Sequence, residues 1–309
     1  MKRIKVAAGV LNQTPLDWDR NKRNILSAID TAINQQVQIL CLPELCITGY
    51  GCEDAFQSMA VQSLALEVLE EIVPHVQGLI VSLGLPLWHA GRLHNVACLA
   101  ANQQVLGFVG KQNLAGDGLH YEPRWFKPWP ENVQASTTLA GREYPLGDLM
   151  FDCSGIRIGF EICEDAWVGN RPGRKLAQQG VDIILNPSAS HFAFGKNQVR
   201  RGFVLEGSRS LNVSYIYANL LGNEAGRAIY DGDAMIASDG QMLVTGPRFS
   251  CREAHLSSAV VDVDQTRMSR EQSDSYSAEK VDDPTSCVSF AFDFAEATDQ
   301  SSEAALEQE

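Results

Sequence analysis

The sequence lacks the features that mark several large classes of protein. It contains no run of the ~18 apolar residues that a transmembrane helix requires. It also has no CxxC pair and no histidine cluster at the spacing of a zinc site. The eight cysteines lie singly along 309 residues, which suits a reducing cytosol better than a disulfide framework. We therefore expect a cytoplasmic protein with no metal site.

Positive charge is also scarce. The chain has 25 Lys and Arg against 38 Asp and Glu, which gives a formal net charge of -13 at pH 7. Nucleic acid and anionic membrane surfaces would repel such a chain, so neither is expected as a partner. Hydrophobic residues make up 45% of the sequence, enough for a sizeable core. A small neutral or zwitterionic ligand is the partner that this composition favours.

What the sequence does contain is an alternation of apolar runs of strand length with amphipathic segments. Three segments with helical spacing of apolar residues are expected to be helices, at 17–36, 54–73 and 196–211. The expected strands lie at 4–10, 37–43, 78–87, 96–100, 105–110, 156–163, 181–187, 213–220, 234–238 and 259–264. This alternation predicts an α/β fold, with more hairpins in the last third of the chain. The first run is interpreted as a strand and not as a signal peptide, because Lys5 interrupts it.

The composition changes near residue 265. Residues 265–309 hold 11 acidic and 3 basic residues, a net charge of -8, with many Ser and Gln. We expect residues 1–264 to form the folded domain and residues 265–309 to form an acidic tail or linker. The one apolar island of this segment, CVSFAFDF at 287–294, could still dock on the body as an edge strand.

Reactive side chains follow several of the expected strands. Glu44, Lys111 and Cys163 each end an apolar run, and Ser188 and Ser190 follow another. Because ligands of open α/β sheets bind beyond the carboxyl ends of the strands, this coincidence predicts a site. Each residue alone has an ordinary explanation, since a lone cysteine in an apolar strand usually fills the core.

The surroundings of Cys163 constrain its chemistry. On an extended strand Glu161 would face the same way as the thiol, and Glu164 and Asp165 follow directly, so negative charge should raise the pKa of the thiol. A nucleophilic Cys163 therefore needs a nearby cation or a base, roles for which Lys111 and Glu44 are the candidates. Of the six histidines only His191 lies just beyond an apolar strand, and it is interpreted as a loop residue.

The sequence words around these residues resemble the nitrilase superfamily of carbon-nitrogen hydrolases. The words are LPELCITGY around Glu44, GKQNLAGDGLHYEPRWF after Lys111 and GFEICEDAW around Cys163. With PSASHFAFGK they are most similar to the glutaminase domain of glutamine-dependent NAD synthetases, over about residues 3–264. The resemblance implies a four-layer α-β-β-α sandwich and an enzyme that releases ammonia from L-glutamine. It also implies Cys163 as nucleophile, Glu44 as general base, Lys111 as oxyanion stabiliser and Glu122 as a second glutamate that orients the lysine.

The resemblance also suggests which residues contact the substrate. The candidate substrate-binding residues are Tyr50, Asp117, Glu164, Ser190 and Lys196. Among them, Glu164 suits the ammonium end of glutamine, and Lys196 suits the carboxylate end. The chain departs from many family members where they carry an LPxY element after the lysine. Here the sequence reads LAGDG, so Asp117 or the loop backbone would replace a tyrosine.

An SGGxDS-type loop, with which NAD synthetases cradle the phosphates of ATP, does not occur in the sequence. No cofactor is therefore expected for this chain, and ATP and deamido-NAD are expected only on a synthetase domain outside it. That domain would be a partner in cis or in trans, and the superfamily resemblance implies a homo-oligomer.

Two alternatives remain open at this stage. The chain could be a nitrilase-type amidase that acts on another small amide or nitrile, and a preference for substrates without an α-amino group would favour that. It could also be an assembly module that is inactive without its partner domain.

Overall fold

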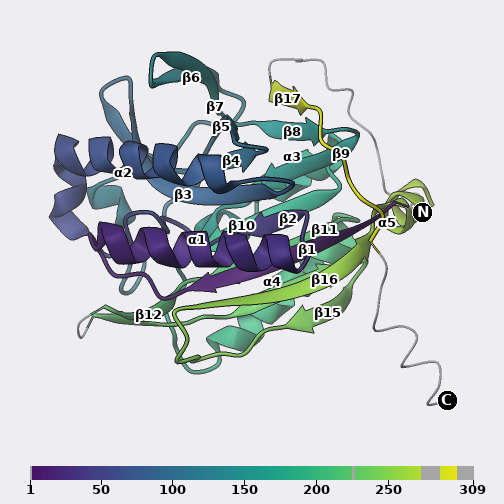
Figure 1. The fold of residues 1–309 in the computed structure, drawn as a ribbon. Coiled ribbons are helices and arrows are strands. Elements are labelled where there is room, and N and C mark those ends of the chain that lie inside the picture. The colour runs from purple at the N-terminus through teal and green to yellow at the C-terminus, as the bar shows by residue number, and fades with distance from the viewer. Residues whose placement is uncertain (1, 225–226, 273–285, 298–309) are drawn as a thin grey trace.

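The computed structural model describes residues 2–224, 227–272 and 286–297. Two β-sheets lie face to face in the middle of the molecule, and helices cover the outer side of each (Figure 1). The predicted four-layer α-β-β-α sandwich is confirmed.

The first sheet has eight strands and includes the N-terminal strand. Their spatial order is β16 (Ala254–Asp262), β1 (Arg3–Leu11), β2 (Ile39–Cys41), β3 (Ile80–His89), β4 (Arg92–Ala101), β5 (Gln104–Gly110), β7 (Arg142–Gly147) and β6 (Gln134–Leu139). β1, β2 and β3 are parallel to one another. Parallel strands are covered on both faces, which explains why β1 and β2 read as continuous apolar runs in the sequence.

The second sheet has seven strands. Their spatial order is β15 (Gln241–Thr245), β14 (Ala234–Ser238), β11 (Ser214–Asn219), β10 (Ile183–Ser188), β9 (Ile156–Phe160), β8 (Met150–Cys153) and β17 (Cys287–Phe290). A separate antiparallel pair consists of β12 (Leu221–Glu224) and β13 (Ala228–Asp231). The antiparallel pairs β11–β14, β14–β15 and β12–β13 match the hairpins expected in the last third of the chain.

Two helices cover each sheet. α1 (Trp18–Asn34) and α2 (Met59–Ile72) pack on the first sheet, α3 (Pro172–Gln178) and α4 (Lys196–Ser210) pack on the second, and α5 (Val263–Glu271) follows β16. Four 3-10 helices lie within the described residues: η1 (Glu53–Gln57), η2 (Val73–His75), η3 (Glu122–Arg124) and η4 (Cys163–Ala166). α1 begins where the Asp17 side chain accepts a hydrogen bond from the Arg20 backbone N–H at 3.2 Å, as a helix N-cap does.

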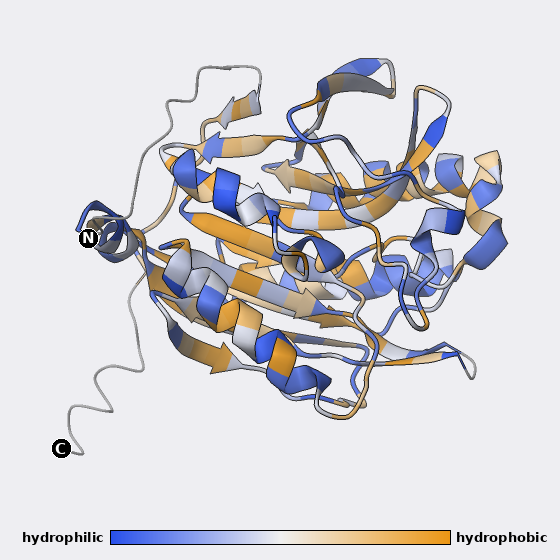
Figure 2. Cartoon of the chain, turned by 180° about the vertical axis from the view of Figure 1, so that it is seen from behind, coloured by the Kyte–Doolittle hydropathy of each residue, from blue (hydrophilic) through white to orange (hydrophobic). Residues whose placement is uncertain are grey.

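The apolar interior is divided by the sheets into three layers. The central layer joins the facing sides of the two sheets, with Val6 and Ala8 on one side and Leu185 and Ile216 on the other. The outer layers hold α1 and α2 against the first sheet, and α3 and α4 against the second. Figure 2 shows the hydrophobic colouring concentrated on the strands, while the helices alternate hydrophobic and hydrophilic residues. This pattern is the one expected for helices with one buried face.

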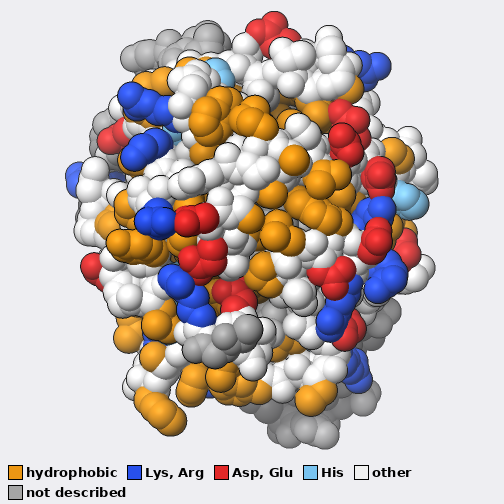
Figure 3. All heavy atoms as spheres, turned by 90° about the vertical axis from the view of Figure 1, so that its left-hand side faces the viewer, with side chains coloured by type: hydrophobic (Ala, Val, Ile, Leu, Met, Phe, Trp, Pro, Cys, Tyr) orange, Lys and Arg blue, Asp and Glu red, His pale blue; other side chains and the backbone are white. Residues whose placement is uncertain are grey.

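The C-terminal segment also contributes to the fold. β17 pairs in parallel with β8 at the edge of the second sheet, so the docking of the apolar island as an edge strand is confirmed. Residues 273–285 and 298–309 lie outside the described residues, and the division at residue 264 into a domain and a linker stays a prediction. Within the described part of the chain, no helix combines the length and apolar character needed to span a membrane. Figure 3 shows one face, on which hydrophobic side chains gather near the centre among acidic and basic ones.

Candidate active site

Polar groups that follow strands of both sheets meet in one buried place. Glu44 follows β2, Lys111 follows β5, and Cys163 lies three residues beyond the end of β9. The backbone N–H of Ala189, just beyond β10, donates a hydrogen bond to Glu44 Oε2 at 3.0 Å, which joins the two sheets here. The strand ends therefore build one group of residues, at the edge where α/β sheets bind their ligands.

Lys111 lies between two carboxylates. Its Nζ is 2.6 Å from Glu44 Oε1 and 2.8 Å from both oxygens of Glu122, and all three side chains are buried. Asn95 Nδ2 donates to Glu44 Oε1 at 2.8 Å and to Glu122 Oε1 at 3.3 Å, while the Ala115 N–H donates to Glu122 Oε2 at 2.7 Å. Asn95 and the Ala115 N–H hold the two carboxylates in place, and the carboxylates in turn hold the lysine ammonium between them.

The pKa values of this pair follow from burial and mutual charge. Burial raises the pKa of Glu44 to about 7, with Lys111 opposing the shift and Glu122 adding to it. For Lys111, burial alone would lower the pKa, but Glu122 and Glu44 raise it well above its ordinary value. At neutral pH the lysine is therefore a fixed cation, whereas the Glu44 carboxyl can both take and give a proton.

Cys163 sits in a tight turn at the first position of η4, with φ of 48°. Asp165 holds the turn: its Oδ2 accepts from the Ile162 N–H at 2.9 Å. Its Oδ1 accepts from the backbone and side-chain N–H groups of Asn113, at 2.7 and 2.9 Å. Since Asn113 lies two residues after Lys111, these bonds fix the turn relative to the lysine. A non-glycine residue at positive φ is uncommon and is found often at functional sites.

The thiol of Cys163 is protonated at neutral pH. Burial raises its pKa, the charge of Glu44 raises it further, and Lys111 opposes the shift. The sequence-based expectation for this pKa was correct in direction, but it named Glu161, Glu164 and Asp165 as the source of the negative charge, whereas Glu44 and Glu122 supply it. Glu161 in particular faces elsewhere. That residue instead pairs with Arg171 and with Tyr215, because β9 ends before it. A protonated thiol can attack only if a base takes its proton.

A pocket of about 280 Å³ opens at Cys163. It is lined by Ala115, Asp117, Gly118, His120, Cys163, Glu164, Trp167, Ser190, His191 and Lys196. The lining carries acidic groups, Asp117 and Glu164, and a basic group, Lys196, whose Nζ lies 5.4 Å from the centre of the Trp167 ring. Ser190 Oγ is buried and has no hydrogen-bond partner among the described residues. The pocket thus offers groups of both charges and a free hydroxyl.

The structure brings eight of the nine predicted site residues into the buried group or the pocket lining. The ninth, Tyr50, does not line this pocket but lies next to Glu122, to whose Oε1 it donates a hydrogen bond at 3.1 Å.

Sequence reasoning missed two further residues of the site, Asn95 and His120. It also did not place His191, interpreted as a loop residue, in the pocket lining. His120 belongs to the quoted word GLHYEPRW, two residues before Glu122, so its place in that word was the available signal. Asn95 lies within β4 and carries no signal in the sequence, because only the sheet brings it to Glu44.

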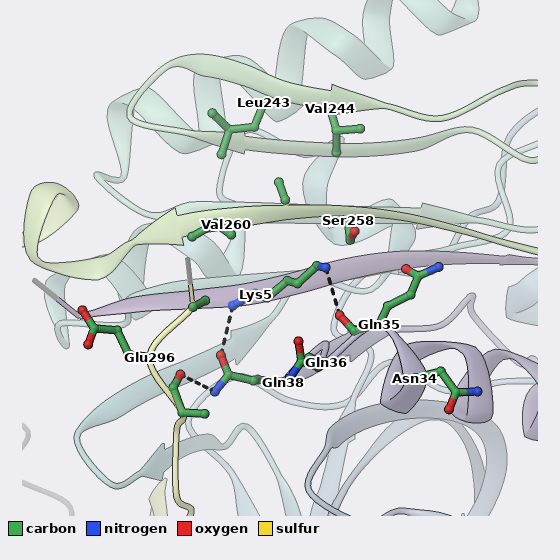
Figure 4. Close-up of a pocket in the computed structure, with 13 residues that line it drawn as sticks. Lys5, Asn34, Gln35, Gln36, Gln38, Leu243, Val244, Ser258, Val260 and Glu296 are labelled. Atoms are coloured by element: carbon green, nitrogen blue, oxygen red, sulfur yellow. Dashed lines mark hydrogen bonds between the residues drawn. The ribbon is translucent and has the colours of Figure 1, made fainter. Parts of the chain in front are cut away.

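A larger groove lies elsewhere and lacks comparable chemistry. It measures about 680 Å³ and is bordered by β1, the end of α1 and the C-terminal segment (Figure 4). Lys5 Nζ donates to the Gln35 carbonyl at 2.9 Å, and Gln38 Nε2 donates to the Ala295 carbonyl at 2.9 Å. Among the described residues, no cysteine or histidine lines this groove. The smaller pocket at Cys163 is therefore the candidate active site.

Comparison with known proteins identifies the family of the chain. Residues 5–270 match the carbon-nitrogen hydrolase family. The chain is 32% identical over 280 residues to the glutamine-dependent NAD(+) synthetase of Saccharomyces cerevisiae, covering 86% of this chain and 39% of the relative. It is 31% identical over 277 residues to the mouse enzyme of the same name, covering 86% of this chain and 38% of the relative. The chain thus spans about two fifths of the length of these relatives.

Solved structures of similar proteins belong to the same kinds of enzyme and share the fold. A glutamine-dependent NAD(+) synthetase from Cytophaga hutchinsonii is 46% identical, with a TM-score of 0.79, and the match covers 84% of this chain and 43% of that one. An amidase of the nitrilase superfamily from Nesterenkonia AN1 shares the fold at 22% identity, with a TM-score of 0.68 and coverage of 86% and 94%. The predicted membership is confirmed, and the chain belongs to the carbon-nitrogen hydrolase family.

Proposed function

We propose that this domain is a glutaminase, which hydrolyses the side-chain amide of L-glutamine to L-glutamate and ammonia. The observation that carries the proposal is the Glu44 carboxyl, buried against Lys111, with its pKa raised to about 7 beside a pocket that holds a cysteine. A carboxyl with this pKa suits both halves of an acyl transfer, since it can act first as base and then as acid.

In the first half of the reaction, Cys163 Sγ bonds to the side-chain amide carbon of glutamine while Glu44 takes the thiol proton. Negative charge develops on the amide oxygen, and the Lys111 ammonium stabilises it. Glu44 then returns the proton to the amide nitrogen, the carbon-nitrogen bond breaks and ammonia leaves. The product is a thioester on Cys163.

In the second half, a water molecule attacks the thioester carbon and Glu44 takes one of its protons. The carbon-sulfur bond breaks, the proton passes from Glu44 to the thiolate, and glutamate is released. Glu122 is a positioning residue in both halves, because it holds the Lys111 ammonium with two oxygens at 2.8 Å.

The charges of the pocket support glutamine as the substrate. Glu164 and Asp117 would attract the α-ammonium group, and Lys196 would attract the α-carboxylate. The unpartnered Ser190 hydroxyl offers a further hydrogen bond. A substrate with a single charged end would leave one of these two charge types unpaired.

The names of the relatives support a partnership with a synthetase domain. The relatives are called glutamine-dependent NAD(+) synthetases, and this chain spans about two fifths of their length. Ammonia released here would feed a domain that binds ATP and deamido-NAD, in cis or in trans, within a homo-oligomer. The free cysteines of the described chain fit the proposed cytoplasmic location.

The first experiment combines the electrophile 6-diazo-5-oxo-L-norleucine, which resembles glutamine, with intact-mass spectrometry and peptide mapping. We expect a single adduct on Cys163 that excess L-glutamine prevents, and we expect no adduct on a Cys163→Ala variant. An adduct that glutamine does not prevent would contradict glutamine as the substrate.

A substrate panel provides the second experiment. L-Glutamine should be hydrolysed with a higher kcat/KM than butyramide, which has no α-groups, and a Glu164→Gln variant should lose most of that preference. Faster hydrolysis of butyramide by the unaltered protein would instead support the small-amide amidase. If neither substrate reacts, repeating the panel with an added synthetase domain would test the partner-dependent module.

A further inference from the structure

Asn95 is a buried residue of β4 that contacts both glutamates of the site and does not line the pocket. Its Nδ2 donates one hydrogen to Glu44 Oε1 at 2.8 Å and the other to Glu122 Oε1 at 3.3 Å. Its Oδ1 is buried and has no hydrogen-bond partner among the described residues. If Oδ1 and Nδ2 were exchanged, an acceptor would face two acceptors, so the neighbours fix the orientation of the amide. Because an unpaired buried acceptor lowers stability, what this side chain contributes is its two donors.

The donors around Glu44 leave one acceptor position on its carboxylate unoccupied. An ionised carboxylate offers about four such positions, roughly two on each oxygen. Oε1 accepts from Lys111 Nζ at 2.6 Å and from Asn95 Nδ2 at 2.8 Å, which fills it. Among the described residues, Oε2 accepts only from the Ala189 N–H, at 3.0 Å. The position that is still open to a proton is therefore on Oε2.

Oε2 is also the oxygen on the side of the nucleophile. Burial and the charge of Glu44 raise the pKa of the Cys163 thiol, while Lys111 and a hydrogen bond from the Ala189 N–H oppose this rise. The same N–H donates to Glu44 Oε2. Oε2 and the thiol therefore lie around one N–H group, where the open position on Oε2 can receive the thiol proton.

The titratable groups around Glu44 come from several elements. They are Lys111, Glu122, Cys163, Tyr50 and Tyr230. Burial is the largest cause that raises the pKa of both tyrosines, and the charge of Glu44 adds to it, so both phenols are neutral at pH 7. Neither phenol donates to Glu44 Oε1, which accepts from the Lys111 ammonium and from Asn95. Within the described part of the chain, the amide of Asn95 is thus the neutral donor that completes Oε1.

We propose that Asn95 is a positioning residue that, together with Lys111, fills Glu44 Oε1 and so makes Oε2 the oxygen that takes and returns the proton. The inference rests on the proposed glutaminase function for the role of that proton. An amide that donates to a carboxylate also favours its ionised form, so Asn95 keeps Glu44 ready to act as a base. Without the amide, both oxygens have an open position, and the proton can settle on Oε1, away from the thiol.

The first test needs no substrate. Infrared difference spectra between pH 6 and pH 9 show the carbonyl stretch of the protonated Glu44 carboxyl, and Glu44→Gln, added to each protein compared, identifies the band by its loss. With the proton on Oε2, the carbonyl oxygen is Oε1, which accepts two hydrogen bonds. In Asn95→Leu it accepts one fewer, so we expect the band to move to higher wavenumber. A band at the same wavenumber in both proteins would place the proton on Oε1 and overturn the proposal, whatever the enzyme hydrolyses.

The second test follows kcat/KM for glutamine as a function of pH, which reports the pKa of the base in the free enzyme. Burial raises the pKa of Glu44 to about 7, and Asn95 is one of the donors that limit this rise. A hydrogen bond to a charged group is typically worth about one to two pH units, and Asn95 divides its donors between two glutamates. In Asn95→Leu we therefore expect the midpoint to move up by about one pH unit. KM should change little, because Asn95 does not line the pocket. A midpoint that stays near pH 7 would overturn the proposal.

Two further variants separate this role from a structural one. Asn95→Ser keeps one donor, so its band and midpoint should lie between those of the native protein and Asn95→Leu, and it replaces Asn95→Leu if that variant does not fold. The matched control is Asn24→Leu, because the buried Asn24 amide donates to the Asn12 carbonyl and to Gln13 Oε1 and contacts neither glutamate. This control should move neither the band nor the midpoint, and equal shifts in Asn24→Leu and Asn95→Leu would overturn the proposal. If glutamine is not hydrolysed at all, the proposed function fails, and the infrared band still decides the inference.

Discussion

Replacing Lys111 with methionine tests whether the buried cation matters for folding as well as for the proposed catalysis. The side chain of Lys111 is fully buried and makes three contacts of 2.6 to 2.8 Å with Glu44 and Glu122. Methionine has a similar volume but no charge, so the main change is that two buried carboxyls lose their cation. Removing one partner of a buried ion pair typically costs about 3–5 kcal/mol of unfolding free energy.

The stability lost in the Lys111→Met variant should also depend on pH. Without Lys111, the pKa of Glu44 in the folded protein rises above its present value of about 7. A carboxyl whose pKa is raised on folding contributes stability at low pH, and that contribution is lost as the pH rises through the folded pKa. Below pH 7 Glu44 keeps its proton in both folded proteins, so the difference between their free energies of unfolding stays constant. Above pH 7 the difference grows by about 1.4 kcal/mol per pH unit, or about 2 kcal/mol by pH 8.5.

The assay is urea unfolding of both proteins at pH 6 and at pH 8.5, followed by circular dichroism. A matched control is Lys22→Met, because Lys22 Nζ lies 2.5 Å from Glu71 Oε2 at the surface. A surface pair of this kind is worth at most about 1 kcal/mol, and its loss should not vary between these pH values. Equal losses for the buried and the surface lysine, or a loss at Lys111 that does not grow with pH, would refute the reasoning.

Three further predictions follow from the same geometry. The kcat/KM of the unaltered enzyme should fall about tenfold per pH unit below pH 7, as Glu44 takes up a proton, and Glu44→Gln should show low activity without this titration. Gly84→Ala should destabilise the fold by roughly 1–3 kcal/mol in urea unfolding and lower activity, because a Cβ would lie 2.3 Å from the Leu45 backbone nitrogen, next to Glu44. Gly202→Ala is its control and should stabilise the fold by about 0.5–1 kcal/mol, since no atom of the described residues lies within 4 Å of a Cβ at that position in α4. Asp165→Asn should lower kcat at least about tenfold with little change in KM in steady-state assays, because Asn accepts fewer of the bonds that hold the Cys163 turn.

The sequence by itself determined the fold class and indicated the three residues that we propose to be catalytic. Apolar runs of strand length are local signals, and the positions of Glu44, Lys111 and Cys163 beyond three of them are visible without any contact. The same reasoning placed no strand at β6, β7, β8, β12, β13 or β15, whose sequences carry shorter or weaker apolar patterns. It also missed the short helices α3 and α5. It also extended β9 through Cys163, because an apolar run does not reveal where a strand gives way to a turn at positive φ.

Only the tertiary structure decided which groups from distant segments face each other. Asn95 reaches both glutamates because β4 pairs with β5, and Tyr50 lies next to Glu122 instead of in the pocket. The contact between His120 and His191 joins residues 71 positions apart, each of which is unremarkable in its own segment. The sequence states which side chains are available near strand ends. Their distances, directions and pKa values depend on burial and on neighbours from elsewhere in the chain, and only the folded structure specifies these.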